Sequence, residues 1–431
     1  MEVHQAHGLR GTIEVPGDKS ISHRSAILGA LAKGDTTITN FLPGADCLAT
    51  LACLRALGVA IEGPDRANRV TVHGHGPESL VEPEDVLNAV NSGTTFRLLA
   101  GVLAGSPFFS VLTGDASLRR RPMARIVRPL SEMGAAIHGR QNDRLPPLAI
   151  RGGRLQGIDH TLPVASAQVK SAILLAGLFA HGTTSVTEPA PSRDHTERML
   201  AGFGADIQKE GLTTVIRPGP SLSGREIKVP GDISSAAFWL VAATLVPESD
   251  ILIREVGINP TRDGIIKVLQ RMGANLEVIP RDPAASEPVA DLHVTSARLR
   301  GVEIGGDLIP SLIDEIPVLA LAAALAKGRT VIRGAAELKV KESNRLATTA
   351  AELRRFGARV EERPDGLVIE GVPQLHGAAA RSHGDHRIAM TVLIAGLAAR
   401  GTTTLDDAAC IDVSFPGFTG LLKTVAAQNS L

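Results

Sequence analysis

The residues best suited to chemistry lie in one segment near the start of the chain, Gly17-Asp18-Lys19-Ser20-Ile21-Ser22-His23-Arg24. A Gly-Asp pair before a run of small and apolar residues is typical of a helix N-terminus, where the carboxylate caps free N–H groups and the dipole favours an anion. Ser20 and Arg24 are four residues apart and would share one face of that helix. The segment therefore predicts a site for phosphate or carboxylate. A solvated basic turn is the alternative for this segment taken alone.

The chain contains an internal control for this segment. The stem Val15-Pro16-Gly17-Asp18 recurs as Val229-Pro230-Gly231-Asp232. In the second copy Ile233 stands where the first has Lys19, and the position of Arg24 is also apolar. Because the repeated stem tolerates apolar side chains at these positions, folding alone does not demand the charges of the first copy.

Further polar clusters lie at the starts of other expected helices or after strands. The segment Asn91-Ser92-Gly93-Thr94-Thr95-Phe96-Arg97 supplies small residues and an Arg, which suit an anion bound by backbone N–H groups. Arg119-Arg120-Arg121-Pro122 crowds three like charges, which costs stability unless an anion or carboxylates relieve it. Ser166-Ala167-Gln168 and Ser192-Arg193-Asp194-His195 add hydroxyls and an Arg that suit a phosphate ester. A capped helix with a surface Arg is the alternative for the first segment, and a solvated loop is the alternative for Arg119 and Arg120.

Carboxylates join the basic residues only in the second half of the chain. Ile313-Asp314-Glu315-Ile316-Pro317 places two carboxylates between apolar residues, where partial burial would raise a pKa toward that of a general base. Lys341 and Arg345 are four apart, which predicts one helical face with Glu342 beside them; a surface helix with ion pairs is the alternative. The segment Gly384-Asp385-His386-Arg387 opens a last helix. Two lobes closing on two anionic ligands would bring these groups together and exclude water.

The composition favours small-molecule ligands. Lys plus Arg equals Asp plus Glu at 45 each in 431 residues, so no overall charge favours nucleic acid or an anionic membrane. Cys47, Cys53 and Cys410 are too few and scattered for a disulfide framework or a zinc site. We therefore expect a soluble cytoplasmic protein, because no export signal and no apolar stretch of about 18 residues is present. With no Tyr and a single Trp, Trp239, stacking on aromatic platforms is excluded as the mode of binding.

A repeat organises the rest of the sequence. The phrase apolar-x-x-apolar-Gly-small-x-apolar occurs five times, and each glycine suits the position after a helix and before a strand. These glycines are Gly58, Gly134, Gly204, Gly273 and Gly357. Ala- and Leu-rich helical runs followed by β-branched strands alternate with them, which gives six units of about 70 residues. Each unit combines two helices with several short strands.

Such units stack as a solenoid or pair around pseudo-symmetry axes, and the pattern alone does not choose. The length exceeds one ordinary core, so two domains are expected. The two Val-Pro stems lie half a chain apart and are the best candidates for chain crossings, since Pro interrupts regular structure. We place the domains at 16–228 and at 1–15 plus 229–431.

In this order the motifs resemble those of the 5-enolpyruvylshikimate-3-phosphate synthase family. The matching segments are Gly17 to Arg24, Asn91 to Thr94, Arg121-Pro122, Ser166 to Gln168, Ser192 to His195, Asp314-Glu315, Lys341 to Arg345 and Asp385 to Arg387. The resemblance implies an α/β fold of two similar domains, each with three βαβαββ repeats around a pseudo-threefold axis in an inside-out α/β barrel. It also implies that the N-terminal strand joins the second domain.

The resemblance implies transfer of the enolpyruvyl group of phosphoenolpyruvate to the 5-hydroxyl of shikimate 3-phosphate, with release of phosphate, in the shikimate pathway to chorismate and aromatic amino acids. The reaction is an addition followed by an elimination, with no metal and no organic cofactor. A cytoplasmic monomer that binds neither nucleic acid nor membrane is expected.

The resemblance also implies site residues on both sides of a cleft, with shikimate 3-phosphate held mainly by the 16–228 lobe and the catalytic carboxylates on the other. The residues implied for shikimate 3-phosphate are Lys19, Ser20, Arg24, Ser166, Ala167, Gln168, Ser192, Arg193, Asp314 and Lys341. Those implied for phosphoenolpyruvate are Lys19, Asn91, Gly93, Arg121, Gln168, Lys341, Arg345, His386 and Arg387. By analogy Asp314 takes the hydroxyl proton, Glu342 protonates the methylene and Lys19 assists the departing phosphate.

The sequence departs from the family pattern at three places. Ala167 replaces a second Ser of the enterobacterial branch, so one phosphate hydrogen bond is absent and Arg193 would compensate. Val413 replaces a Lys of that branch, which leaves the order of lobe closure open. Val90 stands where a Gly usually precedes the Asn. Gly93 is kept, as in targets of glyphosate, but the sequence leaves sensitivity to that inhibitor open.

Three other functions fit the sequence less well. The enolpyruvyl transferase of UDP-N-acetylglucosamine shares the fold, but its motif has Lys-Asn and its mobile loop a reactive Cys, whereas this chain has Lys19-Ser20 and no Cys near Arg121. A non-catalytic anion-binding repeat protein would not need Asp314 or Glu342. An ATP-dependent kinase is disfavoured because no Gly-x-x-x-x-Gly-Lys-Ser/Thr loop is present.

Overall fold

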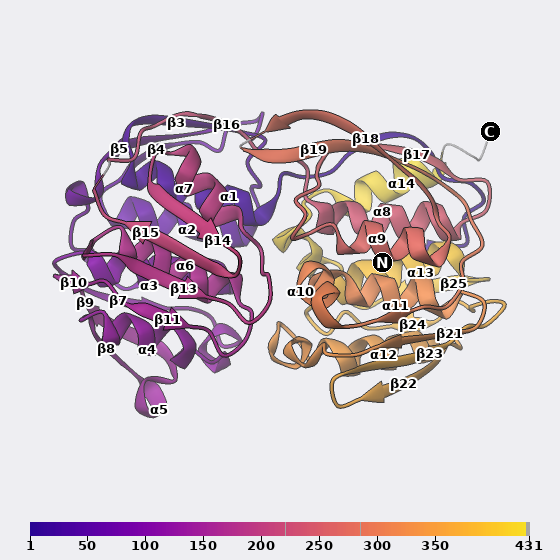
Figure 1. Ribbon diagram of the computed structural model, residues 1–431. Helices are drawn as coiled ribbons and strands as arrows, with labels where there is room; N and C mark the ends of the chain where they lie inside the picture. The colour runs from indigo at the N-terminus through magenta and orange to yellow at the C-terminus, as the bar shows by residue number, and fades with distance from the viewer. Residues whose placement is uncertain (220, 285, 428–431) are drawn as a thin grey trace. The chain divides into compact units, whose positions relative to one another are not determined.

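The structure is a computed structural model that describes residues 1–219, 221–284 and 286–427 (Figure 1). The chain forms two compact units. Unit 1 comprises Met1–Pro16, Gly231–Pro283 and Pro288–Leu431, and unit 2 comprises Gly17–Pro230 and Ala284–Glu287. The chain therefore passes between the units after Pro16, after Pro230 and on both sides of Ala284–Glu287. The sequence analysis placed all of residues 229–431 in one domain and did not predict that Ala284–Glu287 belongs to the other unit.

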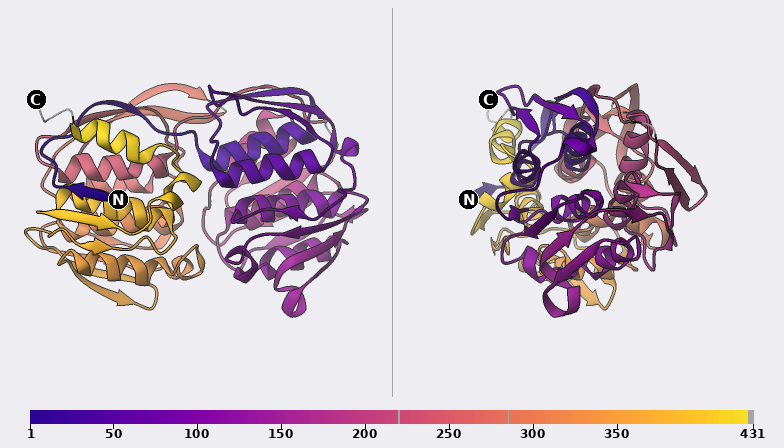
Figure 2. Two further views of the ribbon diagram at one scale, coloured as in Figure 1. Left: turned by 180° about the vertical axis from the view of Figure 1, so that it is seen from behind. Right: turned by 90° about the vertical axis from the view of Figure 1, so that its left-hand side faces the viewer.

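Three four-stranded sheets of one topology form the outside of unit 2, in which the first two strands are parallel and the others antiparallel (Figures 1 and 2). The first holds β16 (Glu226–Lys228), β3 (Lys33–Thr39), β5 (Val70–His75) and β4 (Ala60–Glu62). The second holds β6 (Leu87–Asn88), β7 (Phe109–Thr113), β9 (Leu145–Arg151) and β8 (Ala136–Gly139). The third holds β11 (Asp159–Thr161), β13 (Thr184–Thr187), β15 (Thr213–Arg217) and β14 (Asp206–Glu210). A small parallel pair joins β10 (Leu155–Gln156) to β12 (Ala180–His181).

Unit 1 repeats the same topology. One sheet holds β2 (Arg10–Glu14), β17 (Asp250–Gly257), β19 (Glu287–Thr295) and β18 (Asn275–Ala284). Another holds β20 (Glu303–Ile304), β21 (Arg329–Ile332), β23 (Gly366–Glu370) and β22 (Arg359–Arg363). The third sheet has three strands, β24 (Ala379–Ala380), β25 (Thr402–Leu405) and β1 (Glu2–His4). The N-terminal strands β1 and β2 thus complete two sheets of unit 1, β1 antiparallel to β25 and β2 parallel to β17.

Six helices, three in each unit, are buried on nearly all sides, and the three of a unit lie side by side (Figure 2). They are α1 (Lys19–Leu31), α3 (Gly93–Gly105), α6 (Ala167–Gly177), α8 (Ile233–Leu245), α11 (Ile316–Ala324) and α13 (His386–Ala398). Their Ala- and Leu-rich sequences are apolar all round, so they are stable only when covered. In unit 1, α8, α11 and α13 pack against one another.

A second set of helices alternates with the first along the chain. It contains α2 (Ala45–Ala56), α4 (Ala124–Glu132), α7 (His195–Gly202), α9 (Gly264–Met272), α12 (Arg345–Arg355) and α14 (Phe418–Ala427). The five repeated glycines follow α2, α4, α7, α9 and α12, with φ angles of 87°, 114°, 96°, 96° and 87°. Glycine adopts positive φ without a steric penalty, so each ends its helix before a strand, as the repeat predicted.

Short helical segments connect these elements, and each unit has its own hydrophobic core. The α-helical segments are α5 (Arg140–Asp143) and α10 (Ile309–Leu312). The 3-10 segments are η1 (Pro77–Ser79), η2 (Leu118–Arg120), η3 (Gly306–Leu308), η4 (Ile313–Glu315), η5 (Ala336–Val340) and η6 (Ala409–Val413). Across the described ranges no helix is both long and apolar enough to span a membrane.

Candidate functional site

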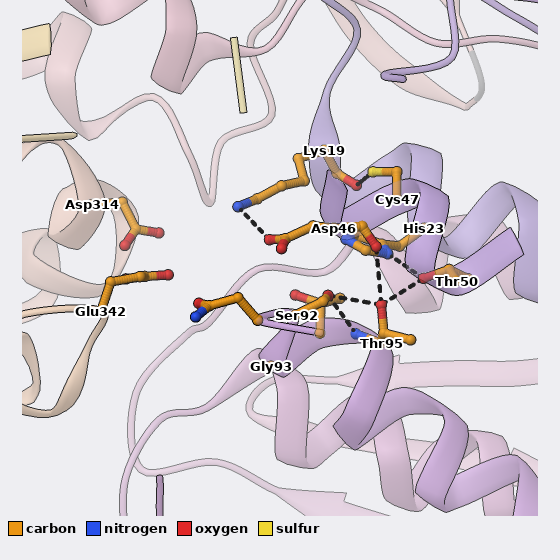
Figure 3. A network of polar contacts seen from close by, with 12 residues as sticks. Lys19, His23, Asp46, Cys47, Thr50, Ser92, Gly93, Thr95, Asp314 and Glu342 are labelled. Atoms are coloured by element: carbon orange, nitrogen blue, oxygen red, sulfur yellow. Dashed lines mark hydrogen bonds and ion pairs between the residues drawn. The ribbon is translucent and has the colours of Figure 1, made fainter. Parts of the chain in front are cut away.

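The predicted anion-binding helix start is present at α1. Asp18 precedes the helix, and its Oδ1 accepts a hydrogen bond from the backbone N of Ile21 at 2.9 Å. Lys19 is the first helical residue, and its Nζ lies 3.2 Å from Oδ2 of Asp46 at the start of α2 (Figure 3). The ion pair holds the ammonium group at the N-terminal end of α1, where the dipole and the cation both favour an anion.

A buried chain of hydroxyls ties α1 to α2 and α3 (Figure 3). Nδ1 of His23 lies 2.7 Å from Oγ1 of Thr50, which lies 2.7 Å from Oγ1 of Thr95. Ser92 caps α3, since its Oγ accepts from the backbone N of Thr95 at 3.1 Å. Burial and the cations of α1 lower the pKa of His23 well below its ordinary value, so the imidazole is neutral at pH 7. These hydrogen-bonded hydroxyls and the neutral imidazole therefore fix the starts of α1 and α3 without adding charge.

Arg24 is buried and is held by hydroxyls from α6 and α7. Its Nε donates to Oγ1 of Thr196 at 2.6 Å, and Nη2 donates to Oγ of Ser171 at 2.8 Å. Nη1 donates to the backbone O of Ser20 at 3.0 Å. Burial lowers the pKa of Arg24 to about 10, which still leaves a cation at pH 7. Ser20 and Arg24 thus lie one turn apart, as predicted.

The loop before α3 places Arg121 beside Asn91. Nη2 of Arg121 donates to Oδ1 of Asn91 at 2.6 Å, and Nδ2 of Asn91 donates to Oδ2 of Asp115 at 2.6 Å. Val90, at the position where the resemblance implies a Gly, has a φ of 51°. A β-branched residue is strained in that region, which explains why glycine suits the position.

Gly93 opens α3 in a crowded basic environment. A Cβ at Gly93 would lie 2.6 Å from Nη1 of Arg97 and 3.4 Å from Nη1 of Arg121. Nη1 of Arg97 donates to Oε1 of Gln168 at 2.7 Å, and Nε2 of Gln168 donates to Oγ1 of Thr94 at 3.0 Å. The Gln168 amide therefore links the starts of α3 and α6.

The remaining predicted residues of unit 2 lie at the starts of α6 and α7. Ser166 is the N-cap residue of α6, but its side chain makes no capping hydrogen bond, and Ala167 is the first helical residue. Ser192 is buried and donates to Oε1 of Glu188. Arg193 is half-buried and acts electrostatically on Arg24.

In unit 1, Arg345 at the start of α12 is the centre of a carboxylate cluster. Its Nη1 lies 3.1 Å from Oδ1 of Asp314, its Nη2 lies 2.6 Å from Oε2 of Glu342, and its Nε lies 2.8 Å from Oδ2 of Asp385. Burial opposes the charge, but the three carboxylates outweigh it and raise the pKa of Arg345 above its ordinary value. Figure 3 draws Asp314 and Glu342, two of the three partners of Arg345.

Lys341 and Arg345 do not share a helical face, so that prediction was wrong. Segment η5 ends at Val340, Lys341 is extended with φ −80° and ψ −154°, and α12 begins at Arg345. Both cations nevertheless reach Asp314, because Nζ of Lys341 lies 3.4 Å from its Oδ1. The prediction for Asp314 considered burial alone, whereas the structure adds two cations, Lys341 and Arg345, as its partners.

The start of α13 adds His386 and Arg387 to the same region of unit 1. Asp385 caps the helix, and its Oδ1 accepts from the backbone N of Arg387 at 3.0 Å. Nη1 of Arg387 lies 3.6 Å from Oε1 of Glu315, which also accepts from Oγ of Ser234 on α8. His386 is buried. The starts of α8, α11 and α13 therefore meet, as those of α1, α3, α6 and α7 do in unit 2.

The structure thus brings the predicted residues together in two sets, one in each unit. The unit 2 set is Lys19, Ser20, Arg24, Asn91, Gly93, Arg121, Ser166, Ala167, Gln168, Ser192 and Arg193, and the unit 1 set is Asp314, Lys341, Glu342, Arg345, His386 and Arg387. In the part of the chain that the structure describes, no group of three or more His, Cys, Asp or Glu is arranged to hold a metal ion.

Sequence reasoning gave no role to several carboxylates that contact these sets, nor to one lysine on α6. Asp46, Asp115 and Asp385 each contact a predicted cation or amide. Lys170 was also missed, although a single Lys in the apolar run Val169-Lys170-Ser171-Ala172-Ile173 is a signal of a buried ion pair.

Comparison with solved structures defines the class of fold. The chain matches EPSP synthase from Acinetobacter baumannii with a TM-score of 0.88 and 48% identity, covering 99% of this chain and 97% of that chain. It also matches the enolpyruvyl transferase NikO from Streptomyces tendae with a TM-score of 0.77 and 22% identity, covering 98% of this chain and 96% of that chain. The fold is therefore the inside-out α/β fold of the enolpyruvyl transferases, as the resemblance implied.

Sequence comparison narrows the class to one family. The profile described as EPSP synthase (3-phosphoshikimate 1-carboxyvinyltransferase) matches residues 3–422. A 3-phosphoshikimate 1-carboxyvinyltransferase from Desulforudis audaxviator is 60% identical over 99% of this chain and 100% of its own length. Another, from Pelotomaculum thermopropionicum, is 59% identical over 99% of this chain and 98% of its own length. The chain belongs to the EPSP synthase family, whose substrates are phosphoenolpyruvate and shikimate 3-phosphate.

Proposed function

We propose that this chain transfers the enolpyruvyl group of phosphoenolpyruvate to the 5-hydroxyl of shikimate 3-phosphate and releases phosphate. Family membership over nearly the whole chain supports the reaction. The single observation that carries the assignment of residues is the buried Arg345 among three carboxylates, with Lys341 beside Asp314. Carboxyl groups that lie beside cations and away from water can donate protons to charged substrates and accept protons from them.

The shikimate 3-phosphate site is proposed to use the helix starts of unit 2. Arg24 supplies a buried cation, and the α1 and α6 N-termini supply N–H groups and dipoles that favour phosphate. The proposed ligands are Lys19, Ser20, Arg24, Ser166, Ala167, Gln168, Ser192 and Arg193, together with Asp314 and Lys341.

The phosphoenolpyruvate site is proposed to use guanidinium groups from both units. Arg121 is oriented by Asn91, and the absence of a side chain at Gly93 leaves room beside it. Guanidinium groups bind carboxylate and phosphate through two parallel hydrogen bonds. The proposed ligands are Lys19, Asn91, Gly93, Arg121, Gln168, Lys341, Arg345, His386 and Arg387.

The proposed chemistry is an addition followed by an elimination. Glu342 in its protonated form gives a proton to the methylene carbon while the 5-hydroxyl oxygen attacks C2, and the Asp314 carboxylate accepts the hydroxyl proton. The adduct then returns a methyl proton to Glu342 and the double bond re-forms. Phosphate leaves with the proton that Asp314 had accepted, while Lys19 stabilises its charge. Lys341 and Arg345 hold the carboxylate of Asp314 in place for its task.

A coupled phosphate-release assay tests the reaction. Phosphate is expected from phosphoenolpyruvate with shikimate 3-phosphate and not with UDP-N-acetylglucosamine; release with the UDP-sugar, or with neither, would contradict the proposal. Asp314→Asn is expected to lower kcat by about 100-fold or more, the usual contribution of a general base. Asp307→Asn, an exposed residue of η3, is the matched control. Full turnover by the Asp314 variant would favour a different base, and binding without turnover by the wild type would favour the anion-binding protein.

The proposal places a monomer in the cytoplasm, with small molecules as its only partners and without metal or organic cofactor. Dialysis against a chelator is expected to leave turnover unchanged.

A further inference from the structure

Lys170 on α6 is buried completely and lies between two buried carboxylates. Its Nζ is 2.5 Å from Oε2 of Glu188 and 2.6 Å from Oε1 of Glu197, and the three side chains are 0%, 2% and 7% exposed. Burial opposes the charge, but Glu197 and Glu188 outweigh it and raise the pKa of Lys170 above its ordinary value. The three residues therefore form a charged cluster inside unit 2, here called the Lys170 triad, which the chemistry above does not use.

The Lys170 triad joins the segments that carry the proposed ligands of shikimate 3-phosphate. Lys170 lies in the first turn of α6, where its backbone N donates to the O of Ser166 at 3.0 Å. Glu188 follows β13, and its Oε1 accepts from Oγ of Ser192. Glu197 lies in the first turn of α7, next to Thr196, which accepts from Arg24. One ammonium group thus connects the start of α6, the loop of Ser192 and the start of α7.

The charges of the Lys170 triad also match the cation that it supports. One Lys and two Glu give a net charge of −1, and among the charges around Arg24 that of Glu197 most strongly opposes the effect of burial on its pKa. Arg24 is itself only 4% exposed. A buried guanidinium needs such a counter-charge, because removing one partner of a buried ion pair leaves an uncompensated charge.

We infer that Lys170, Glu188 and Glu197 are positioning residues for the phosphate of shikimate 3-phosphate. The triad fixes Ser192 through Glu188 and Arg24 through Glu197 and the neighbouring Thr196, and it sets the distance between α6 and α7. This inference rests on the proposed function, and it assigns the triad to one substrate only. Arg121 and Asn91 bind each other through contacts that do not involve the triad.

The decisive variant removes all three charges together as Lys170→Met, Glu188→Gln and Glu197→Gln. Removing the ammonium group together with both carboxylates leaves no charge of the triad without its partner. A smaller loss of Tm is therefore expected than for Lys170→Met alone, although Arg24 loses the counter-charge of Glu197. The Kd of the triple variant for shikimate 3-phosphate, measured by calorimetry, is expected to rise about 10-fold or more, with the KM for phosphoenolpyruvate within 2-fold of the wild type. Arg217→Met with Asp206→Asn removes an exposed ion pair of the same unit and is the matched control, with no effect on either substrate.

A second variant decides the matter if the triple variant does not fold. Glu188→Gln keeps the shape of the side chain and leaves the pair of Lys170 with Glu197 in place. Its Kd for shikimate 3-phosphate is expected to rise about 5- to 20-fold. Adding Ser192→Ala is expected to cause a smaller loss than Ser192→Ala causes in the wild type, because both changes affect the contact between Glu188 and Ser192.

The outcomes separate this inference from the function on which it rests. Wild-type protein that neither binds nor converts shikimate 3-phosphate would overturn the proposed function. Wild-type turnover together with unchanged shikimate 3-phosphate affinity in the triple variant, or in Glu188→Gln, would overturn the positioning role. An equal loss of affinity for both substrates would also overturn it, since the triad would then serve only the stability of unit 2.

Discussion

Asp385 offers the sharpest test of the carboxylate cluster in unit 1. It is completely buried, and its Oδ2 accepts from Nε of Arg345 at 2.8 Å and from Oγ of Ser343 at 2.9 Å. Its Oδ1 accepts from Nη2 of Arg345 at 3.2 Å and from the backbone N of Arg387 at 3.0 Å. Burial opposes ionisation, but Arg345 outweighs it and lowers the pKa of Asp385 below its ordinary value.

Asp385→Asn replaces one acceptor oxygen by an NH2 group without changing the size of the side chain. Whichever way the amide is oriented, its NH2 faces one N–H of Arg345, so at least one charge-assisted hydrogen bond is lost. Such a bond contributes about 1.5–3 kcal/mol, and breaking a buried ion pair costs about 3–5 kcal/mol. Arg345 keeps Asp314 and Glu342 as partners, so we expect the free energy of unfolding to fall by about 2–3 kcal/mol, less than for a fully broken buried ion pair. This is a large share of a total stability of about 5–15 kcal/mol.

Urea unfolding at pH 7 measures the difference in the free energy of unfolding. Asp307→Asn is the control, because Asp307 is exposed and its change is expected to lie within about 0.5 kcal/mol of the wild type. The KM for phosphoenolpyruvate is expected to rise in Asp385→Asn, since Arg345 loses one of its three anchors. A free energy of unfolding for Asp385→Asn as close to the wild type as that of the control would refute the stabilising role assigned to this carboxylate.

Two further predictions concern unit 2. Burial lowers the pKa of His23 below 6.5 in the folded state, so only the unfolded chain takes up this proton just below pH 6.5. Its contribution is therefore complete above that pH and is lost as the pH falls, by up to about 1.4 kcal/mol per pH unit. Urea titrations from pH 7 to 5 should show a weaker pH dependence in His23→Gln than in the wild type or in the exposed control His376→Gln, and equal slopes would contradict the burial argument. Arg24→Ala is expected to weaken mainly shikimate 3-phosphate and Arg121→Ala mainly phosphoenolpyruvate, each by about 1.5–3 kcal/mol. Calorimetric titration with each substrate checks this, and no loss in either variant would rule out the two assignments.

Local rules in the sequence predicted the elements that carry the site. Asp18 caps α1 because a short acidic side chain satisfies free N–H groups best from that position. Gly273 ends α9 in the left-handed region, as glycine does at the end of many helices. The motifs therefore fall at helix starts, where the sequence placed them.

Local rules could not predict ion pairs between residues that are distant in the sequence. Arg345 and Asp385 are 40 residues apart, and no periodicity links them. The helix expected over Lys341 and Arg345 was wrong for a local reason, since Asn344 caps α12 by accepting from the backbone N of Ala347 at 3.3 Å. Asn competes with a continuous helix for backbone hydrogen bonds and favours its start instead.

The segment Ala284–Glu287 has a consequence for how the chain matures on the ribosome. Glu287 belongs to unit 2, where its Oε1 lies 2.7 Å from Nδ1 of His195, yet it is translated 57 residues after Pro230. At about 5 to 20 residues per second, synthesis needs about 3 to 11 seconds to reach it. Until then the nascent N-terminal half lacks the carboxylate that contacts His195, so its folding is completed only after Glu287 has been translated.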